Sequence, residues 1–314
     1  MASEQSQQIL MYKIAHAYYE DGMTQQDIGK RFGLSRIKVG RLLKQAQHEK
    51  IVRIILREPQ NSDEIELEHC IQEKYKVDEV ILVPAIDDNQ RVLQKIGIAT
   101  AIYLNRTLHG DEVIGLTWGG SVLAVVNALP NKNWPDMKVV QLLGGLGSPE
   151  ADMYGTQLTV RTAQSFGAKP RLISAPGILP TEELCEALSK DHQVADTLKL
   201  GSKADVAIAG LGRPTQTSPI IRAGILTTDE LDDLNRLGAV GDIGLRFINA
   251  EGQPINHELD RRIIGLTLEQ YQTIPKLIGV AGGPDKFEIV RAALLGKYIN
   301  VLITDLEIGK RLLV

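Results

Sequence analysis

The feature that most restricts the fold of this chain is an alternation, from about residue 79 onward, between short apolar runs and longer stretches of helical periodicity. Short runs rich in Val, Ile and Leu are typical of buried strands, and strands that alternate with helices indicate βαβ units. We therefore expect an α/β fold built around a mostly parallel, Rossmann-type sheet. The predicted strands are Val80–Val83, Val113–Leu116, Val139–Leu143, Arg171–Ala175, Val206–Ala209, Leu277–Ala281 and Val301–Thr304. Examples of the predicted helices are Arg91–Leu108, Thr156–Phe166, Thr228–Leu237 and Lys286–Leu295.

Charge divides the chain into two regions. Residues 1–57 hold ten Lys and Arg against five Asp and Glu, whereas the remainder holds 25 basic and 34 acidic residues. The length of 314 residues is sufficient for two domains. We therefore expect a basic domain over residues 1–57 that binds a polyanion, and a domain over residues 58–314 that begins with a linker helix at 58–76. A solvated charged face is the alternative explanation of the basic region.

The basic region has the pattern of a helix-turn-helix domain. Residues 7–20 place apolar side chains at helical spacing, and residues 24–27 have the form of a capping box that opens a short second helix. Gly33-Leu34-Ser35 predicts a tight turn, in which Ser35 would cap a third helix over residues 36–47. That helix would bury a stripe formed by Val39, Leu42, Leu43 and Ala46.

The opposite face of the third predicted helix suits DNA, because residues 36–48 contain no acidic side chain. Lys and Arg neutralise phosphates, Ser and Gln bond to the backbone or to base edges, and Arg can contact guanine through two hydrogen bonds. Gly40 would let a phosphate approach closely. The predicted contacts to double-stranded operator DNA are Thr24, Gln25, Ser35, Arg36, Ile37, Lys38, Gly40, Arg41 and Lys44. The alternative is a helical hairpin with a charged outer face; residues 53–57 predict a short strand or wing.

Glycines cluster immediately after several of the predicted strands, at residues 115–121, 144–147, 210–212 and 282–283. In a parallel sheet these loops leave the same edge, and ligands bind outside the carboxyl ends of the strands. The loop Trp118-Gly119-Gly120-Ser121 precedes a predicted helix, so its backbone N–H groups and the Ser121 hydroxyl could hold a phosphate. A loop that merely turns the chain is the alternative for each cluster taken alone.

Other ligand motifs fail in this sequence. There is no G-x-x-x-x-G-K-[ST] loop, and Gly144 to Gly147 lacks the full dinucleotide-binding spacing. The six histidines show no metal-ligand spacing, and Cys70 and Cys185 lie far apart outside any paired motif. No apolar run approaches the ~18 residues of a membrane span, and the first residues lack a signal-peptide pattern. We therefore expect a soluble cytoplasmic protein without a metal or cofactor.

The chain resembles the SorC family of bacterial sugar-responsive transcriptional regulators over nearly its whole length. The resemblance is carried by the helix-turn-helix at Thr24–Lys44, and by Gly115–Ser121, Ala204–Gly212, Gly238–Asp242, Val280–Gly283 with Lys286, and Asn300–Asp305. It implies a regulator of a sugar-utilisation operon, controlled by a sugar or sugar phosphate, with sorbose as one candidate. It also implies a sugar-binding domain similar to the sugar-phosphate isomerase and deaminase fold, and a tetramer built as a dimer of dimers.

The resemblance also implies roles for individual residues. Gly119, Gly120 and Ser121 match the loop that holds the phosphate or equivalent end of the effector, and Gly144 and Gly145 match a second loop of the pocket. Asp242 matches an acidic position that binds sugar hydroxyls, and Lys286 matches a lysine near the anionic end. The complete set of predicted effector-binding residues is Trp118, Gly119, Gly120, Ser121, Gly144, Gly145, Gly210, Gly212, Asp242 and Lys286. A turn cap for Asp242 and a surface lysine for Lys286 are the alternatives.

An enzyme is the main alternative function. An isomerase or deaminase acting on sugar phosphates needs a general base beside the sugar carbonyl. Deaminases that resemble this fold place a His followed by a Glu just after the glycines that match Gly210 and Gly212, but residues 213–218 of this chain contain neither His nor a carboxylate. We therefore expect no catalytic residues; a structural adaptor would leave the glycine-lined edge without a purpose.

Overall fold

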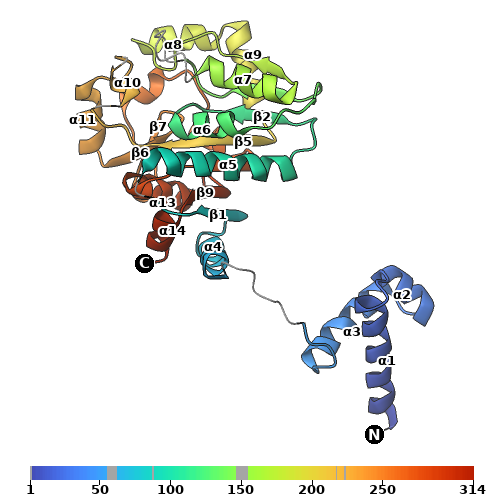
Figure 1. The fold of residues 1–314 in the computed structure, drawn as a ribbon. Helices are drawn as coiled ribbons and strands as arrows, with labels where there is room; N and C mark the ends of the chain where they lie inside the picture. Colours follow the sequence, from blue (N-terminus) through green and yellow to red (C-terminus); the bar gives the residue numbers. More distant parts are fainter. Residues whose placement is uncertain (1, 55–61, 87, 146–154, 217, 223) are drawn as a thin grey trace. The chain divides into compact units, whose positions relative to one another are not determined.

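A computed structural model describes residues 2–54, 62–86, 88–145, 155–216, 218–222 and 224–314 of the chain (Figure 1). The chain forms two compact units, Met1–Asn61 and Ser62–Val314. The division after residue 57 stays a prediction, because residues 55–61 lie outside the described residues. None of the described helices is long and apolar enough to cross a membrane.

The first unit is a helix-turn-helix domain of three helices, α1 (Ala2–Tyr19), α2 (Gln25–Phe32) and α3 (Arg36–His48). Thr24 accepts a hydrogen bond from the backbone N–H of Asp27 at 3.2 Å, and Ser35 accepts one from Lys38 N–H at 3.2 Å. Both predicted caps are therefore confirmed. Gly33 has a φ of +69°, which a glycine adopts without strain, so α2 ends where the turn was expected. Residues 51–54 form no strand, and the rest of the predicted wing lies outside the described residues.

The apolar stripe of α3 forms the core of this unit. Its predicted members are all buried, and they pack against residues from the other two helices. The contacts from α1 come from Met11 and Ile14, and α2 contributes Ile28. Because every buried residue of α3 lies on one face, the opposite face is free to meet another molecule.

The second unit contains a sheet whose main path runs in the order β1-β9-β8-β5-β2-β3-β4, with every pair parallel. These strands are β1 (Glu79–Val83), β2 (Val113–Leu116), β3 (Lys138–Gln141), β4 (Lys169–Arg171), β5 (Val206–Gly212), β8 (Lys276–Val280) and β9 (Val301–Asp305). The predicted parallel α/β fold is thus confirmed. One strand differs: the expected strand at 171–175 begins earlier, because residues 169–171 are those that pair with β3.

Two further strands, β6 (Ala239–Ile243) and β7 (Arg246–Asn249), are absent from the sequence prediction. They form an antiparallel hairpin that pairs with the end of β5, where Gly212 lies opposite Asp242. Polar and small residues interrupt the apolar pattern of both strands, so periodicity alone does not reveal them. This hairpin extends the sheet over the carboxyl end of β5.

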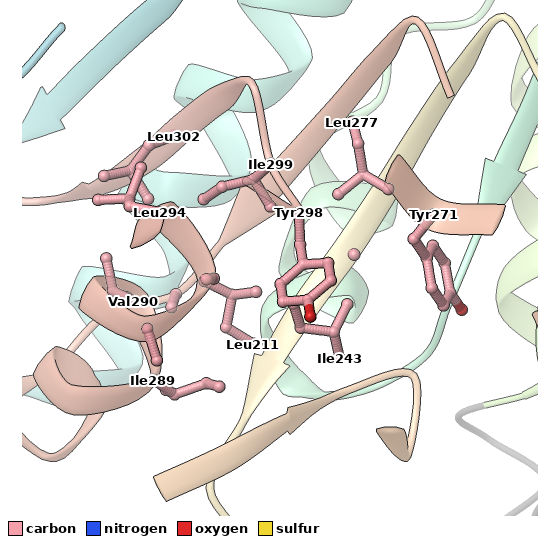
Figure 2. Packing of buried hydrophobic residues seen from close by; sticks show 14 of the residues in the cluster. Leu211, Ile243, Tyr271, Leu277, Ile289, Val290, Leu294, Tyr298, Ile299 and Leu302 are labelled. Atoms are coloured by element: carbon pink, nitrogen blue, oxygen red, sulfur yellow. The ribbon is translucent and has the colours of Figure 1, made fainter. Parts of the chain in front are cut away.

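Helices cover both faces of the sheet (Figure 1). They are α4 (Ser62–Tyr75), α5 (Asn89–Thr107), α6 (Gly120–Ala128), α7 (Thr156–Phe166), α8 (Glu182–Ser189), α9 (His192–Gly201), α10 (Pro219–Arg222), α11 (Thr228–Arg236), α12 (Leu268–Gln272), α13 (Phe287–Leu295) and α14 (Leu306–Leu313), with 3₁₀ turns η1 (Glu258–Arg262) and η2 (Pro284–Lys286). On one face of the sheet, the buried residues of α5, α6 and α7 pack with Ile208 and Ile303. On the other face, the buried residues of α4, α13 and α14 pack with Leu277 and Leu302. Figure 2 shows part of this second core. Strand residues thus alternate between two cores.

The edge strand β1 is protected by a side chain of α4. Glu68 Oε1 accepts a hydrogen bond from the backbone N–H of Leu82 at 2.8 Å, on the edge of β1 that no other strand covers. Burial raises the pKa of the Glu68 carboxyl, and the Leu82 N–H opposes that shift. Because an unpaired strand edge can pair with another chain, this contact both anchors α4 and occupies a donor that would otherwise be free.

The close approach of α5 and α6 generates a first prediction. Gly97 lies where an added Cβ would overlap the backbone carbonyl of Ala124. Replacing a helical glycine with alanine normally stabilises a helix by up to about 1 kcal/mol. Here we expect Gly97→Ala to destabilise the unit by about 1–3 kcal/mol, because the helices must separate. Calorimetric unfolding measures the effect; a higher melting temperature would show that the two helices are not held this closely.

Candidate ligand pocket and nucleic-acid interface

A cavity of about 310 Å³ opens at the carboxyl ends of β2 and β5. From β2 the sheet continues through β3 to β4 on one side, and on the other side β5 leads to β8 and β9. Ligands bind α/β sheets at such a reversal of strand order, since the loops there diverge and leave a crevice. The cavity is lined by Trp118, Gly119, Gly120, Ser121, Leu143, Gly210, Leu211, Gly212, Arg213, Pro214, Ser218, Ile220, Asp242, Gly244, Leu245 and Lys286.

The loop between β2 and α6 presents backbone donors to the cavity. Gly119 precedes α6 with a φ of +134°, a conformation that side-chain-bearing residues rarely adopt, and an added Cβ there would meet open space. The first hydrogen bond of α6 runs from Leu123 N–H to Gly119 C=O. The N–H groups of Gly120, Ser121 and Val122 therefore have no acceptor within the helix. Together with the helix dipole, they form a site suited to an anion.

Two hydrogen bonds hold this loop in place. The buried Thr117 hydroxyl accepts from Gly210 N–H at 3.1 Å, which joins the ends of β2 and β5. Trp118 Nε1–H donates to the Gly144 carbonyl at 3.0 Å, which joins the same loop to the segment after β3. The donors at the start of α6 are consequently fixed before any ligand arrives.

Asp242 contributes the cavity's carboxylate from β6. Its Oδ2 accepts a hydrogen bond from Leu245 N–H at 2.9 Å, and its Oδ1 lies over Gly212, where a Cβ would overlap the oxygen. Burial raises the pKa of Asp242, whereas the Leu245 N–H and the charge of Lys286 act in the opposite direction. The glycine at 212 is thus required because the carboxylate fills the space of a side chain.

Lys286 ends η2 and faces the same cavity. Burial lowers the pKa of its ammonium group; the charge of Asp242 opposes this shift, and the charge of Arg213 adds to it. Within the described residues no direct ion pair joins Lys286 to Asp242. Arg213 donates from Nη1 to the Asp285 carbonyl at 3.1 Å, which holds it beside the lysine. Each charged group keeps hydrogen-bonding capacity for a ligand.

This arrangement can bind a molecule with two different ends. Helix N–H groups and the cations of Arg213 and Lys286 suit an oxyanion, since N⁺–H donors form the stronger, charge-assisted hydrogen bonds. Asp242 suits hydroxyl groups, which donate to a carboxylate. Among the described lining residues there is one carboxylate and no histidine.

Eight of the ten predicted effector-binding residues line this cavity, and Gly144 and Gly145 do not. Gly144 instead allows backbone segments to approach closely, because a Cβ there would collide with the carbonyls of Ala175 and Pro176. The N–H of Gly145 donates to the same Ala175 carbonyl. Gly144 still supports the site indirectly, because its carbonyl orients Trp118.

Sequence reasoning missed the remaining lining residues, which are Leu143, Leu211, Arg213, Pro214, Ser218, Ile220, Gly244 and Leu245. Arg213 directly follows the Gly210–Gly212 cluster, so its position in the sequence could have indicated it. Gly244 and Leu245 belong to the turn of the unpredicted hairpin β6–β7, and their position had no signal in the apolar pattern.

The outer face of α3 carries five of the predicted DNA contacts. Arg36, Lys38, Arg41 and Lys44 are all exposed, and among the described residues none of them is in an ion pair. Ile37 lies with them, with 71% of its surface exposed. The face therefore combines free cations with an apolar side chain, as in a helix that enters the major groove.

Four of the predicted DNA contacts also have local roles, and one of them is Ser35, which caps α3. The Thr24 hydroxyl donates to the Asp27 carboxylate at 2.6 Å while it caps α2. Gln25 is partly buried, and its Oε1 lies 3.3 Å from where a Cβ on Gly40 would be. Gly40 thus leaves room for α2 to pack on α3 as well as for the expected phosphate.

Asp242 generates a second prediction. Its folded-state pKa is raised above the ordinary value of 3.8, so its ionisation destabilises the folded state as pH rises through the raised pKa. Asp242→Asn keeps an acceptor for Leu245 N–H and removes the charge. We expect a higher melting temperature than wild type at pH 7.5, and a smaller difference as the pH falls towards 4. A variant that is less stable at pH 7.5 would show that the carboxylate charge stabilises the fold.

Comparison with known proteins identifies a family of regulators. Residues 60–314 match a family model described as "Putative sugar-binding domain". The transcriptional regulator LsrR of Klebsiella pneumoniae is 31% identical over 300 residues, which cover 94% of this chain and 90% of that protein. The deoxyribonucleoside regulator of Bacillus subtilis is 27% identical over 310 residues, which cover 98% of each.

Solved structures agree with these sequence matches. The crystal structure of the full-length sorbitol operon regulator SorC from Klebsiella pneumoniae matches with a TM-score of 0.76 and 27% identity, and the match covers 97% of this chain and 98% of that one. The probable sor operon regulator of Shigella flexneri gives a TM-score of 0.74 at 25% identity, covering 80% of this chain and all of that one. With its helix-turn-helix unit and its sugar-binding domain, the chain belongs to the SorC family of transcriptional regulators.

Proposed function

We propose that this regulator binds operator DNA through the outer face of α3 and responds to a phosphorylated sugar bound in the cavity between β2 and β5. One observation carries the proposal: a single cavity combines the free N–H groups of α6, two cations and one carboxylate. The anion-binding groups fit a phosphate, and the carboxylate fits the hydroxyls of the sugar.

The charges of the cavity favour a sugar phosphate over a free sugar. Arg213 and Lys286 outnumber Asp242, and the positive end of α6 adds to the imbalance. A neutral sugar would leave both cations partly desolvated without an anionic partner, which is unfavourable. A phosphate would neutralise them and accept hydrogen bonds from the Gly119–Ser121 loop.

The sugar can be identified by a thermal-shift screen. Among the relatives, one regulates a sorbitol operon and another is a deoxyribonucleoside regulator, so hexitols, hexoses including sorbose, and pentoses belong in the screen. A compound that binds only the folded state raises the melting temperature. Each sugar is compared with its phosphate ester, and the proposal requires the ester to give the larger shift.

Lys286→Met provides the third prediction. The variant keeps the length of the side chain and removes its ammonium group. Loss of a charge-assisted hydrogen bond should weaken binding of the best sugar phosphate by about 10- to 150-fold, or about 1.5–3 kcal/mol. Titration calorimetry measures the affinity. Lys203→Met is the matched control, because the exposed Lys203 precedes β5 at the opposite edge of the sheet. Equal affinities for both variants would contradict the assignment of Lys286.

DNA binding requires more than one helix-turn-helix unit. A single unit covers a short half-site, and specific binding commonly uses two units on half-sites one helical turn, or a multiple of it, apart. We therefore propose a homo-oligomer, with a tetramer as a dimer of dimers. We also propose a cytoplasmic location, because operator DNA lies in the bacterial cytoplasm. Because its relatives are named transcriptional regulators, we propose that the protein acts as a regulator and not as an enzyme.

Arg41→Ala and Lys44→Ala give the fourth prediction. Both side chains are exposed on α3, so each variant should weaken binding to a DNA fragment selected by the wild-type protein from a random pool. Each lost phosphate contact should also reduce the magnitude of the slope of log K against log[salt] by about 0.9. Lys169→Ala, on β4, is the control and should bind as wild type does. Unchanged affinity in both α3 variants would contradict the proposed interface.

A further inference from the structure

Helix α14 contacts the loop that carries Lys286. Arg311, in its last turn, donates from Nη1 to the Pro284 carbonyl at 3.2 Å, and its guanidinium carbon lies 3.9 Å from the ring centre of Phe287. At the other end of the helix, the buried Asp305 accepts from Gly283 N–H at 2.7 Å through Oδ2, and caps α14 through Oδ1. Arg311 near the end of α14 thus contacts η2 and the residue after it, and Asp305 at the start of α14 is bonded to the residue before η2.

The same helix is bonded to α4. The carbonyl of Leu312 accepts two hydrogen bonds from α4, one from Lys74 Nζ at 2.8 Å and one from Tyr75 Oη at 3.1 Å. Carbonyls in the last turn of a helix have no acceptor role within the helix, and these two donors satisfy one of them. Ile71 and Tyr75 of α4 and Leu312 of α14 also belong to one apolar core, so the contact is packed as well as hydrogen-bonded.

A second connection reaches α4 through α13. This helix begins directly after Lys286, and its Val290 and Leu294 belong to the same apolar core as Tyr75. The charge of Arg291 on α13 lowers the pKa of Tyr75, against the larger effect of burial. Tyr75 is therefore hydrogen-bonded to α14 and shares an apolar core with α13, the helix that starts beside Lys286. The middle of α4 is held independently, by the bond between Glu68 and Leu82 on β1.

We infer that α14 and Tyr75 form the coupling element of the regulator, which transmits the position of the Lys286 loop to α4. This inference rests on the proposed function. α4 is the first helix of the second unit, and residues 55–61 join it covalently to the helix-turn-helix unit. A helix of eight residues is about 12 Å long and rigid, so a shift of η2 at one side moves the Lys74 and Tyr75 contacts at the other. With its middle fixed by Glu68, α4 responds by changing its tilt.

The coupling must act in both directions. If effector binding changes operator affinity by a certain factor, operator binding changes effector affinity by the same factor. Removing the contacts between α14 and α4 should reduce that factor and leave each binding event intact, because neither Lys74 nor Tyr75 lines the cavity or lies in the helix-turn-helix unit. This separates a coupling residue from a residue of either binding site.

The test uses the full-length double variant Lys74→Met with Tyr75→Phe, which keeps the apolar parts of both side chains. Lys76→Met is the matched control, because Lys76 is exposed and its ion pair is with Glu73 on the surface. The probe is the tightest-binding sugar phosphate of the thermal screen, beginning with D-sorbitol 6-phosphate, and the DNA is the selected fragment. Calorimetry gives the affinity for the sugar phosphate, and fluorescence anisotropy gives the affinity for DNA with and without it.

We expect wild type and Lys76→Met to change DNA affinity by at least about 5-fold on saturation with the sugar phosphate, and the double variant by less than about 2-fold. The double variant should retain wild-type affinity for the sugar phosphate and for DNA measured alone. An unchanged response in the double variant would overturn the coupling role. A double variant that loses sugar-phosphate or DNA affinity would also overturn it, since the contacts would then support a binding site. No response in wild type would instead refute the proposed function, and this inference with it.

Discussion

The pairing of β2 with β5 is the constraint on which the rest of this structure depends. The parallel sheet reverses its direction of growth there, and the Thr117 hydroxyl bonds to Gly210 N–H across the two strand ends. The loop before α6 and the end of β5 are thereby fixed on opposite sides of one crevice. Because β6 then pairs with β5, Asp242 is brought to the same place from a distant part of the sequence. Without this pairing, the loop before α6, the end of β5 and β6 would not enclose a cavity.

The cavity holds two charged side chains, Asp242 and Lys286, in a buried environment that disfavours their charged forms. Burial is the largest influence on both Asp242 and Lys286, raising one pKa and lowering the other. Their mutual attraction only partly offsets it, since no direct ion pair joins them among the described residues. Groups that a stable fold would pair or expose are typical of binding sites, where the ligand supplies the missing partner. The burial of these charges without a direct partner therefore supports the assignment of this cavity as the proposed ligand site.

The proposed binding surfaces of the two units arise in different ways, one from a local sequence pattern and the other from the order of the strands. In α3 one periodic pattern assigns apolar residues to the core and leaves basic residues exposed, so a local feature of the sequence creates the face that we propose binds DNA. In the second unit no local pattern is sufficient. Lys286, Asp242 and the Gly119 loop belong to three separate segments, and only the order of the strands makes them neighbours. The contacts of α14 with α4 likewise join residues far apart in the sequence.

The sequence alone determined the three helices of the first unit, the caps of Thr24 and Ser35, and the parallel α/β class, because these follow from periodicity and local hydrogen bonding. Its resemblance to a family also indicated half of the residues that line the cavity. The tertiary structure decided what local pattern does not encode: the hairpin β6–β7, the place of Arg213 in the cavity, and the structural part played by Gly144. These features depend on which strands pair and which backbone segments touch. Such contacts join segments that are distant in the chain, and the local sequence of each segment does not indicate its partner.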